Sequence, residues 1–234
     1  MRRVFLRLSV LVLTVFAVSC GQGSGGGGSI AEEFDLSGPQ STAQFTVGSE
    51  TFAEQRILGQ IAIQALEAAG ADVADSTGLG SNEAVRQALI DDDISLYWEY
   101  TATGWLVFLG QPNPISDPQE QYKAVAERDL EENGIEWLPP APGNNTYAIA
   151  ANEEAARELG VETISDLGRL LEERPEEAKL CFDNQDDFRN RSDGLPGLEE
   201  AYGFEFPEEN LIVVSLDAVY GTVEEGEICN FGVV

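Results

Sequence analysis

The stretch QFTVGSETFAEQRILGQIAIQALEAAG, residues 44–70, predicts a β-strand followed directly by an amphipathic α-helix. Residues 44–48 favour a strand because they carry β-branched and aromatic side chains and end at a glycine. The TFAE sequence at residues 51–54 fits a capping box, so we expect the helix to begin there and to end at Gly70. Its apolar face would consist of Ile57, Leu58, Ile61, Ala65, Leu66 and Ala69. The stretch therefore opens a β-α-β unit.

The same alternation of strands and helices continues along the first half of the chain. A glycine-bearing turn at residues 78–82 leads into a second predicted helix around Val85, and residues 94–100 have the composition of a strand. A third helix is predicted from Asp117, with proline at its first position, to Gly134. This order of elements predicts a mostly parallel sheet with helices on both faces.

A proline-rich segment, PPAPGNN at residues 139–145, interrupts this pattern. Proline fixes the backbone, so the segment suits a connection between two rigid halves. The second half is predicted to have strands at residues 146–151, 179–182, 211–214 and 227–231, and helices at residues 153–159, 165–173 and 217–225. We therefore expect an α/β protein of two lobes, residues 44–142 and 143–231, with a ligand cleft between them.

The N-terminal residues 1–20 have the features of an export signal. Three arginines precede an apolar run at residues 8–18, which is too short to span a bilayer. Small residues before Cys20 resemble a lipobox, although Ala17 stands where leucine is usual, so we expect Cys20 to carry a lipid. Residues 21–43 begin with a glycine-serine tract that predicts a flexible tether. The expected location is the extracytoplasmic face of the membrane, and the alternative is a plain secreted protein.

The charge of the chain excludes several kinds of function. Among 234 residues there are 13 Lys or Arg, 42 Asp or Glu and no His, which gives a formal net charge of −29. A basic nucleic-acid-binding surface and histidine-based catalysis or metal binding are therefore excluded. We expect no cofactor and no metal. The many acids indicate a solvated surface, and no pair of carboxylates stands out as the catalytic pair of a glycosidase.

Two cysteines remain once Cys20 is assigned to a lipid. In an exported protein, Cys181 and Cys229 predict one disulfide that closes a loop of about fifty residues. The alternative is a pair of buried free thiols. A catalytic thiol is disfavoured because no histidine is present to activate it.

Four ordered motifs resemble the binding proteins of ABC importers for glycine betaine, choline and proline. They are GSETFAEQ with ILG at residues 48–59, WEYTAT at 98–103, NNTYA at 144–148 and RSDGLPGL at 191–198. The resemblance implies the type II periplasmic-binding-protein fold and no enzymatic activity. It also implies a quaternary ammonium ligand, carnitine among the candidates, an ABC permease as partner and a role in osmoprotection.

The same resemblance implies an aromatic cage for the ligand. A trimethylammonium group has no N–H to donate, so aromatic ring faces bind it instead. The matching positions are Tyr100, Tyr147 and Tyr220, and a further ring would come from Phe231 or from a residue after Val234. For each tyrosine the alternative is a half-buried core position with a satisfied hydroxyl group.

Three further side chains are assigned to the ligand by the resemblance. Arg191 would clamp a ligand carboxylate with its two-pronged guanidinium, and Thr103 would add a hydroxyl donor. The alternative for Arg191 is a surface salt bridge. Glu50 stands where many family members have lysine, and a glutamate there would repel a carboxylate and favour a choline-like cation.

Two other expectations concern the whole chain. The resemblance implies a further segment after Val234 that returns to the first lobe and completes its sheet, without which strand edges would be exposed. A sensory or scaffold lipoprotein with the same fold is the alternative to an importer subunit.

Overall fold

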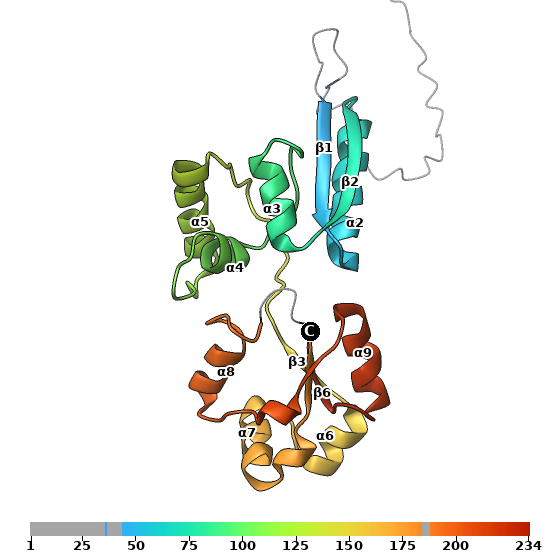
Figure 1. The fold of residues 1–234 in the computed structure, drawn as a ribbon, viewed down its shortest axis with the longest axis vertical. Helices are drawn as coiled ribbons and strands as arrows, with labels where there is room; N and C mark the ends of the chain where they lie inside the picture. Colours follow the sequence, from blue (N-terminus) through green and yellow to red (C-terminus); the bar gives the residue numbers. More distant parts are fainter. Residues whose placement is uncertain (1–35, 37–43, 184–187) are drawn as a thin grey trace, which may run out of the picture.

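The computed structural model describes residue 36, residues 44–183 and residues 188–234, and these form two lobes (Figure 1). Each lobe contains its own sheet. The chain crosses from the first lobe to the second after residue 134, through the proline-rich segment (Figure 1). The expected signal sequence, Cys20 and nearly all of the tether lie outside the described residues. No helix in the described part of the chain is long and apolar enough to cross a membrane.

The first lobe is built on two parallel strands, β1 (Gln44–Glu50) and β2 (Asp72–Gly80). A parallel bridge between Val47 and Leu96 gives β1 a second neighbouring segment, on the side away from β2. The helical elements of this lobe are α2 (Ala53–Ala68), α3 (Asn82–Ile90), α4 (Thr101–Thr103), the π-helical turn η1 (Gly104–Phe108) and α5 (Pro118–Asn133).

The second lobe has a four-stranded sheet in the order β3-β6-β4-β5. Its strands are β3 (Ile149–Ala151), β4 (Leu180–Phe182), β5 (Leu211–Val213) and β6 (Phe231–Val233). Its helical elements are α6 (Glu153–Leu159), α7 (Ile164–Glu173), η2 (Pro175–Glu177), α8 (Leu195–Tyr202), η3 (Glu208–Asn210) and α9 (Leu216–Glu225). Strand β4 is parallel to both of its neighbours, and only the β3–β6 pair is antiparallel. The expected mostly parallel sheet is thus confirmed.

The second lobe contains the larger apolar core among the described residues. Phe182 and Phe231 are almost fully buried in it, together with leucines of α7. Cys181 and Cys229 form a disulfide in a second cluster against α9. The disulfide joins β4 to the turn before β6, as the two cysteines predict.

Helix α2 differs from its prediction in both its start and its buried face. Phe52 is the N-cap and no side chain caps the helix, so the expected capping box at residues 51–54 is wrong. Ile57 and Ile61 are 61% and 53% exposed, whereas the buried face includes Gly59. A Cβ atom on Gly59 would lie 2.7 Å from Thr77 Cγ2 of β2. The close approach of Gly59 to the sheet therefore turns a face with Gln55, Gly59 and Ile63 inward, rather than the most apolar one.

The predicted strand at residues 94–100 is also wrong, because only Leu96 makes a strand-like bridge. After Leu96, the backbone forms hydrogen bonds with side chains instead of with a neighbouring strand. Gln55 Nε2 donates to the Trp98 carbonyl oxygen at 3.0 Å, and the Tyr100 N–H donates to Glu99 Oε1 at 2.7 Å. Strand β2 and helix α8 were not predicted, and α3, α5, α6, α7 and α9 lie close to their predicted positions.

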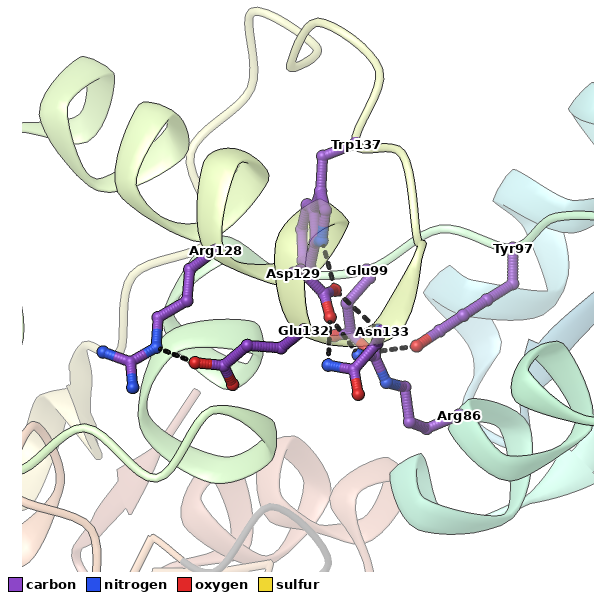
Figure 2. Close-up of polar contacts among 8 residues, drawn as sticks. All are labelled: Arg86, Tyr97, Glu99, Arg128, Asp129, Glu132, Asn133 and Trp137. Atoms are coloured by element: carbon purple, nitrogen blue, oxygen red, sulfur yellow. Dashed lines mark hydrogen bonds and ion pairs between the residues drawn. The ribbon is translucent and has the colours of Figure 1, made fainter.

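A buried ion pair joins α3 to α5 in the first lobe (Figure 2). The Arg86 guanidinium donates to both carboxylate oxygens of Asp129, and its Nη1 lies 2.8 Å from Oδ2. Trp137 Nε1 donates to Asp129 Oδ2 and Asn133 Nδ2 to Oδ1, each at 2.7 Å. The pair thereby fixes α5 and the start of the crossing segment against the rest of the lobe.

Candidate functional site

The two lobes contact each other through buried polar side chains. Thr103, at the end of α4, is 4% exposed, and Arg191, in the turn before α8, is 8% exposed. Arg191 Nη1 donates to Thr103 Oγ1 at 3.1 Å. Two of the residues assigned to the ligand by sequence are therefore brought together from opposite lobes.

Four aromatic rings lie along the same boundary, and we call Phe52, Tyr100, Tyr147 and Phe188 the aromatic cluster. In the first lobe, Phe52 and Tyr100 stack with ring centroids 6.4 Å apart. In the second lobe, Tyr147 meets Phe188 edge-on at 5.2 Å. Phe52 lines one small cavity with Tyr147 and Phe188, so rings of both lobes face a common space.

Tyr100 is held by hydrogen bonds from its side-chain hydroxyl and from its backbone N–H. Its hydroxyl donates to Glu54 Oε1 at 2.6 Å, and its backbone N–H donates to Glu99. Burial and the hydrogen bond to Glu54 raise the pKa of the Tyr100 phenol well above its usual range. The ring is therefore neutral at physiological pH, and its electron-rich face is kept.

Tyr147 already has a cation over its ring in this structure. The Arg191 guanidinium carbon lies 5.6 Å from the ring centroid, which is within the range of a cation–π interaction. The Tyr147 face thus has the exposure and geometry needed to accept a positive group inside the boundary between lobes.

The guanidinium of Arg191 has a carboxylate partner within its own turn. Its Nε and Nη2 each lie 2.9 Å from an oxygen of Asp193, and the two side chains are 6% and 18% exposed. The alternative reading, a salt bridge with an acid, is therefore present in the structure, but the pair is largely buried and does not lie on the surface. A ligand carboxylate at Arg191 would share the guanidinium with Asp193 or compete with it.

Glu50 lies at the end of β1 and is 2% exposed. Its charge contributes, as a smaller cause, to the raised pKa of Tyr100, so it lies within electrostatic reach of that ring. The neighbouring Ser49 hydroxyl donates to the Glu50 carbonyl oxygen and accepts the Gly78 N–H. These bonds hold the end of β1 in a fixed position beside the boundary.

The structure does not bring Tyr220 to the aromatic cluster. Tyr220 lies on α9, is 64% exposed and lines a separate hollow with Asn152 and Arg157. Phe231 is 1% exposed within the core of the second lobe and offers no ring face to a ligand. In this structure the rings that join Tyr100 and Tyr147 at the boundary are therefore Phe52 and Phe188.

Sequence reasoning missed several residues of the boundary. Phe52 and Glu54 lie inside the first family motif but were assigned to a helix cap. Asp183 and Phe188 come after the carboxyl end of strand β4 in the sequence, and both line the small cavity. Ligands of parallel sheets bind at the carboxyl ends of the strands, so this position could have indicated both residues from the sequence. Gln55 has its Oε1 buried with no partner in the structure, beside the backbone that leads to Tyr100.

Two α/β lobes with an aromatic, partly charged boundary between them define a substrate-binding protein of the two-lobed class. Residues 43–233 match the OpuAC family, described as the substrate binding domain of the ABC-type glycine betaine transport system. The chain belongs to this family. Its fold is the type II periplasmic-binding-protein fold.

Individual proteins resemble the chain over most of its length. A glycine-betaine-binding protein of Pseudomonas aeruginosa is 37% identical over 177 residues, which cover 74% of this chain and 56% of that protein. The chemotactic signal transduction system substrate-binding protein CosB of Halobacterium salinarum is 31% identical over 192 residues, covering 77% and 57%. The solved structure of apo YehZ from Escherichia coli has a TM-score of 0.56 at 30% identity, covering 82% of this chain and 69% of that one. The chain thus spans slightly more than half the length of the Pseudomonas aeruginosa and Halobacterium salinarum proteins.

Proposed function

We propose that this chain captures a quaternary ammonium compound between its lobes and delivers it to an ABC permease. The candidate solutes are glycine betaine, choline, carnitine and the related solute proline, and we assign the chain no catalytic activity. The observation that carries the proposal is the aromatic cluster, in which rings from both lobes face one space. Each ring face would contribute roughly 0.5–2 kcal/mol to binding of the ammonium head.

Access of the ligand requires the lobes to move. The cavity in the aromatic cluster measures about 40 Å³, close to the roughly 30 Å³ that one water molecule takes up in liquid. A trimethylammonium group is larger than that. We therefore infer that the lobes open about their crossing segments to admit the ligand and close on it, which would present a defined surface to the permease.

The proposal includes export and anchoring. Residues 1–20 would direct secretion, Cys20 would carry the lipid, and residues 21–43 would let the lobes reach the permease from the outer face of the membrane. Uptake of such solutes would serve osmoprotection.

Calorimetric titration of the full chain with glycine betaine and with choline tests the proposal. Saturable binding of at least one ligand is expected, and a Tyr147→Ala variant should lose most of that affinity. Tyr202→Ala is the matched control, because Tyr202 lies on α8 outside the aromatic cluster. Circular dichroism should show that all samples are folded. A Tyr147→Ala chain that binds as tightly as the parent contradicts the proposal, and so does a folded parent that binds neither ligand.

A second candidate function is ligand sensing without transport. The similarity to CosB, named for a chemotactic signal transduction system, is the observation that favours it. Uptake of labelled betaine or choline by cells with and without the gene separates the two functions. Equal uptake in both, together with binding in vitro, would support sensing.

A further inference from the structure

We propose that Trp137 is a positioning residue for ligand binding, and that it sets the position of Thr103 from the start of the crossing segment. This inference rests on the proposed function, because Thr103 accepts the hydrogen bond from Arg191 that joins the lobes around a ligand. Among the described residues, Trp137 lies outside those that line the cavity of the aromatic cluster. It therefore acts through Thr103 and not on the ligand itself.

The indole ring of Trp137 packs against Gly104, the residue directly after Thr103. A Cβ atom on Gly104 would lie 2.6 Å from Trp137 Cζ2 and 2.7 Å from Cη2, which is closer than real Cβ atoms come to other atoms. Gly104 is buried and begins the π-helical turn η1, which continues α4. Such turns are rare and are frequently found at functional sites. The lack of a side chain on Gly104 thus lets the backbone next to Thr103 lie directly on the indole ring.

Trp137 is fixed to the first lobe through both its side chain and its backbone. Its Nε1 donates at 2.7 Å to Asp129 Oδ2, and Asp129 is buried in its ion pair with Arg86 (Figure 2). Hydrogen bonds to an ionised acceptor are stronger than those between neutral groups. The Trp137 carbonyl oxygen accepts the Tyr122 hydroxyl proton at 3.1 Å. Both bonds attach Trp137 to α5, so its ring is a firm support for the turn that carries Thr103.

Trp137 is also the last residue before the exposed part of the crossing segment. Residues 138–146 are all exposed, and they include the proline-rich segment at 139–145. Hinges are a few loop residues that absorb changes in backbone dihedral angles, so we expect movement between the lobes to occur after Trp137. The same residue then fixes the first-lobe end of the hinge and the turn that carries Thr103. Thr103 thereby keeps one position relative to the hinge, and closing the lobes brings its Oγ1 to 3.1 Å from Arg191 Nη1.

The first test is a double-mutant cycle of Trp137→Phe and Thr103→Val. Calorimetric titration of the full chain with glycine betaine and with choline gives the affinities. Phenylalanine keeps an aromatic ring but lacks the outer indole atoms that contact Gly104 and the N–H group that donates to Asp129. Alone, Trp137→Phe should weaken both ligands by about three- to tenfold, because loss of support for Thr103 costs no more than loss of its bond to Arg191. In the Thr103→Val background, the same change should weaken them less than about twofold.

The second test exchanges volume across the contact. Gly104→Ala alone places a methyl group against the indole ring and should weaken both ligands by about tenfold. Adding Trp137→Phe removes the two atoms nearest to that methyl group, so it should restore about threefold or more of the lost affinity. Trp105→Phe is the matched control. It removes an indole from the same turn, but this indole donates to the Asn113 carbonyl oxygen, so both affinities should stay unchanged.

Circular dichroism of each variant separates these effects from unfolding, and the double-mutant cycle decides alone if Gly104→Ala does not fold. If the parent binds and Trp137→Phe binds as tightly, the inference is overturned and the proposed function stands. If the Trp137→Phe loss is equal in both backgrounds, adds to the Gly104→Ala loss or is matched by Trp105→Phe, Trp137 only supports the fold and the inference is likewise overturned. If a folded parent binds neither ligand, both proposals fail.

Discussion

Arg191 of the second lobe donates a hydrogen bond from Nη1 to Thr103 Oγ1 of the first lobe, and both residues are buried. Because the bond joins the lobes, any opening that separates them at this point would break it. It therefore stabilises the closed form relative to any open one, and a hydrogen bond to a charged group is worth about 1.5–3 kcal/mol. Under the proposed function, this contact would couple lobe closure to ligand binding.

Replacing Thr103 by valine should weaken the binding of every ligand that depends on closure. Valine keeps the shape of threonine but cannot accept from Arg191, so betaine and choline affinities should both fall by about tenfold. Small-angle scattering of the ligand-free variant should also show a larger radius of gyration than that of the parent. Thr101→Val is the control, because Thr101 accepts from Gln121 within the first lobe. Unchanged affinities in the Thr103 variant would refute the coupling.

Replacing Asp193 by asparagine should shift selectivity toward carboxylated ligands. Arg191 donates to both oxygens of Asp193 at 2.9 Å, so the aspartate matches its charge. Asparagine keeps one oxygen acceptor but no charge, which leaves a net positive charge for a ligand carboxylate. The betaine-to-choline Kd ratio, measured by titration calorimetry, should fall about tenfold. An equal change for both ligands would indicate that Asp193 only supports the fold.

Helix ends with local signals were predictable from sequence, whereas contacts distant in sequence were not. The Asp117 side chain accepts the N–H groups of Gln119 and Glu120, and Gly134 has φ 70°, so both ends of α5 follow from neighbouring residues. The buried face of α2 depends on Gly59 meeting Thr77 across the sheet. Apolar periodicity within the helix contains no information on that contact.

In the candidate site, too, residues within a sequence motif could be predicted, whereas contacts between distant segments could not. Tyr100 and Tyr147 could be named because each lies in a family motif, and the structure places both at the boundary between lobes. Phe52 and Phe188 come from separate lobes and share a cavity only after the chain has folded. The Arg191–Asp193 pair spans two residues and was accessible to sequence reasoning, but its burial was not.

Reduction of the Cys181–Cys229 disulfide should destabilise the second lobe. The bond closes a loop with a sequence separation of 48 residues. The chain-entropy model gives about 4 kcal/mol for such a loop. Thermal unfolding with and without a reductant measures the effect as a lower Tm in the reduced parent. A Cys181→Ala/Cys229→Ala variant retains Cys20 and should not respond to reductant, so a response there would assign the effect to Cys20.

The Arg86–Asp129 pair predicts how the stability of the first lobe depends on pH (Figure 2). Burial acts to raise the pKa of Asp129, but hydrogen bonds from Arg86, Trp137 and Asn133 outweigh it and lower the pKa below its ordinary value of 3.8. A carboxyl group with a lowered folded-state pKa stabilises the protein above its unfolded-state pKa. That contribution is lost as the pH falls below 3.8 and through the folded-state pKa.

An Asp129→Asn variant should therefore lose stability at pH 7 and lose less at pH 3. Removing one partner of a buried pair costs about 3 kcal/mol, because the Arg86 charge stays buried. Urea unfolding at the two pH values measures the difference. Glu132→Gln on the same helix is the matched control, since its pair with Arg128 is about half exposed and worth under about 0.5 kcal/mol. If both variants lose equal stability at pH 7, or if the Asp129→Asn loss is the same at pH 3, the charge of Asp129 is not what joins α3 to α5.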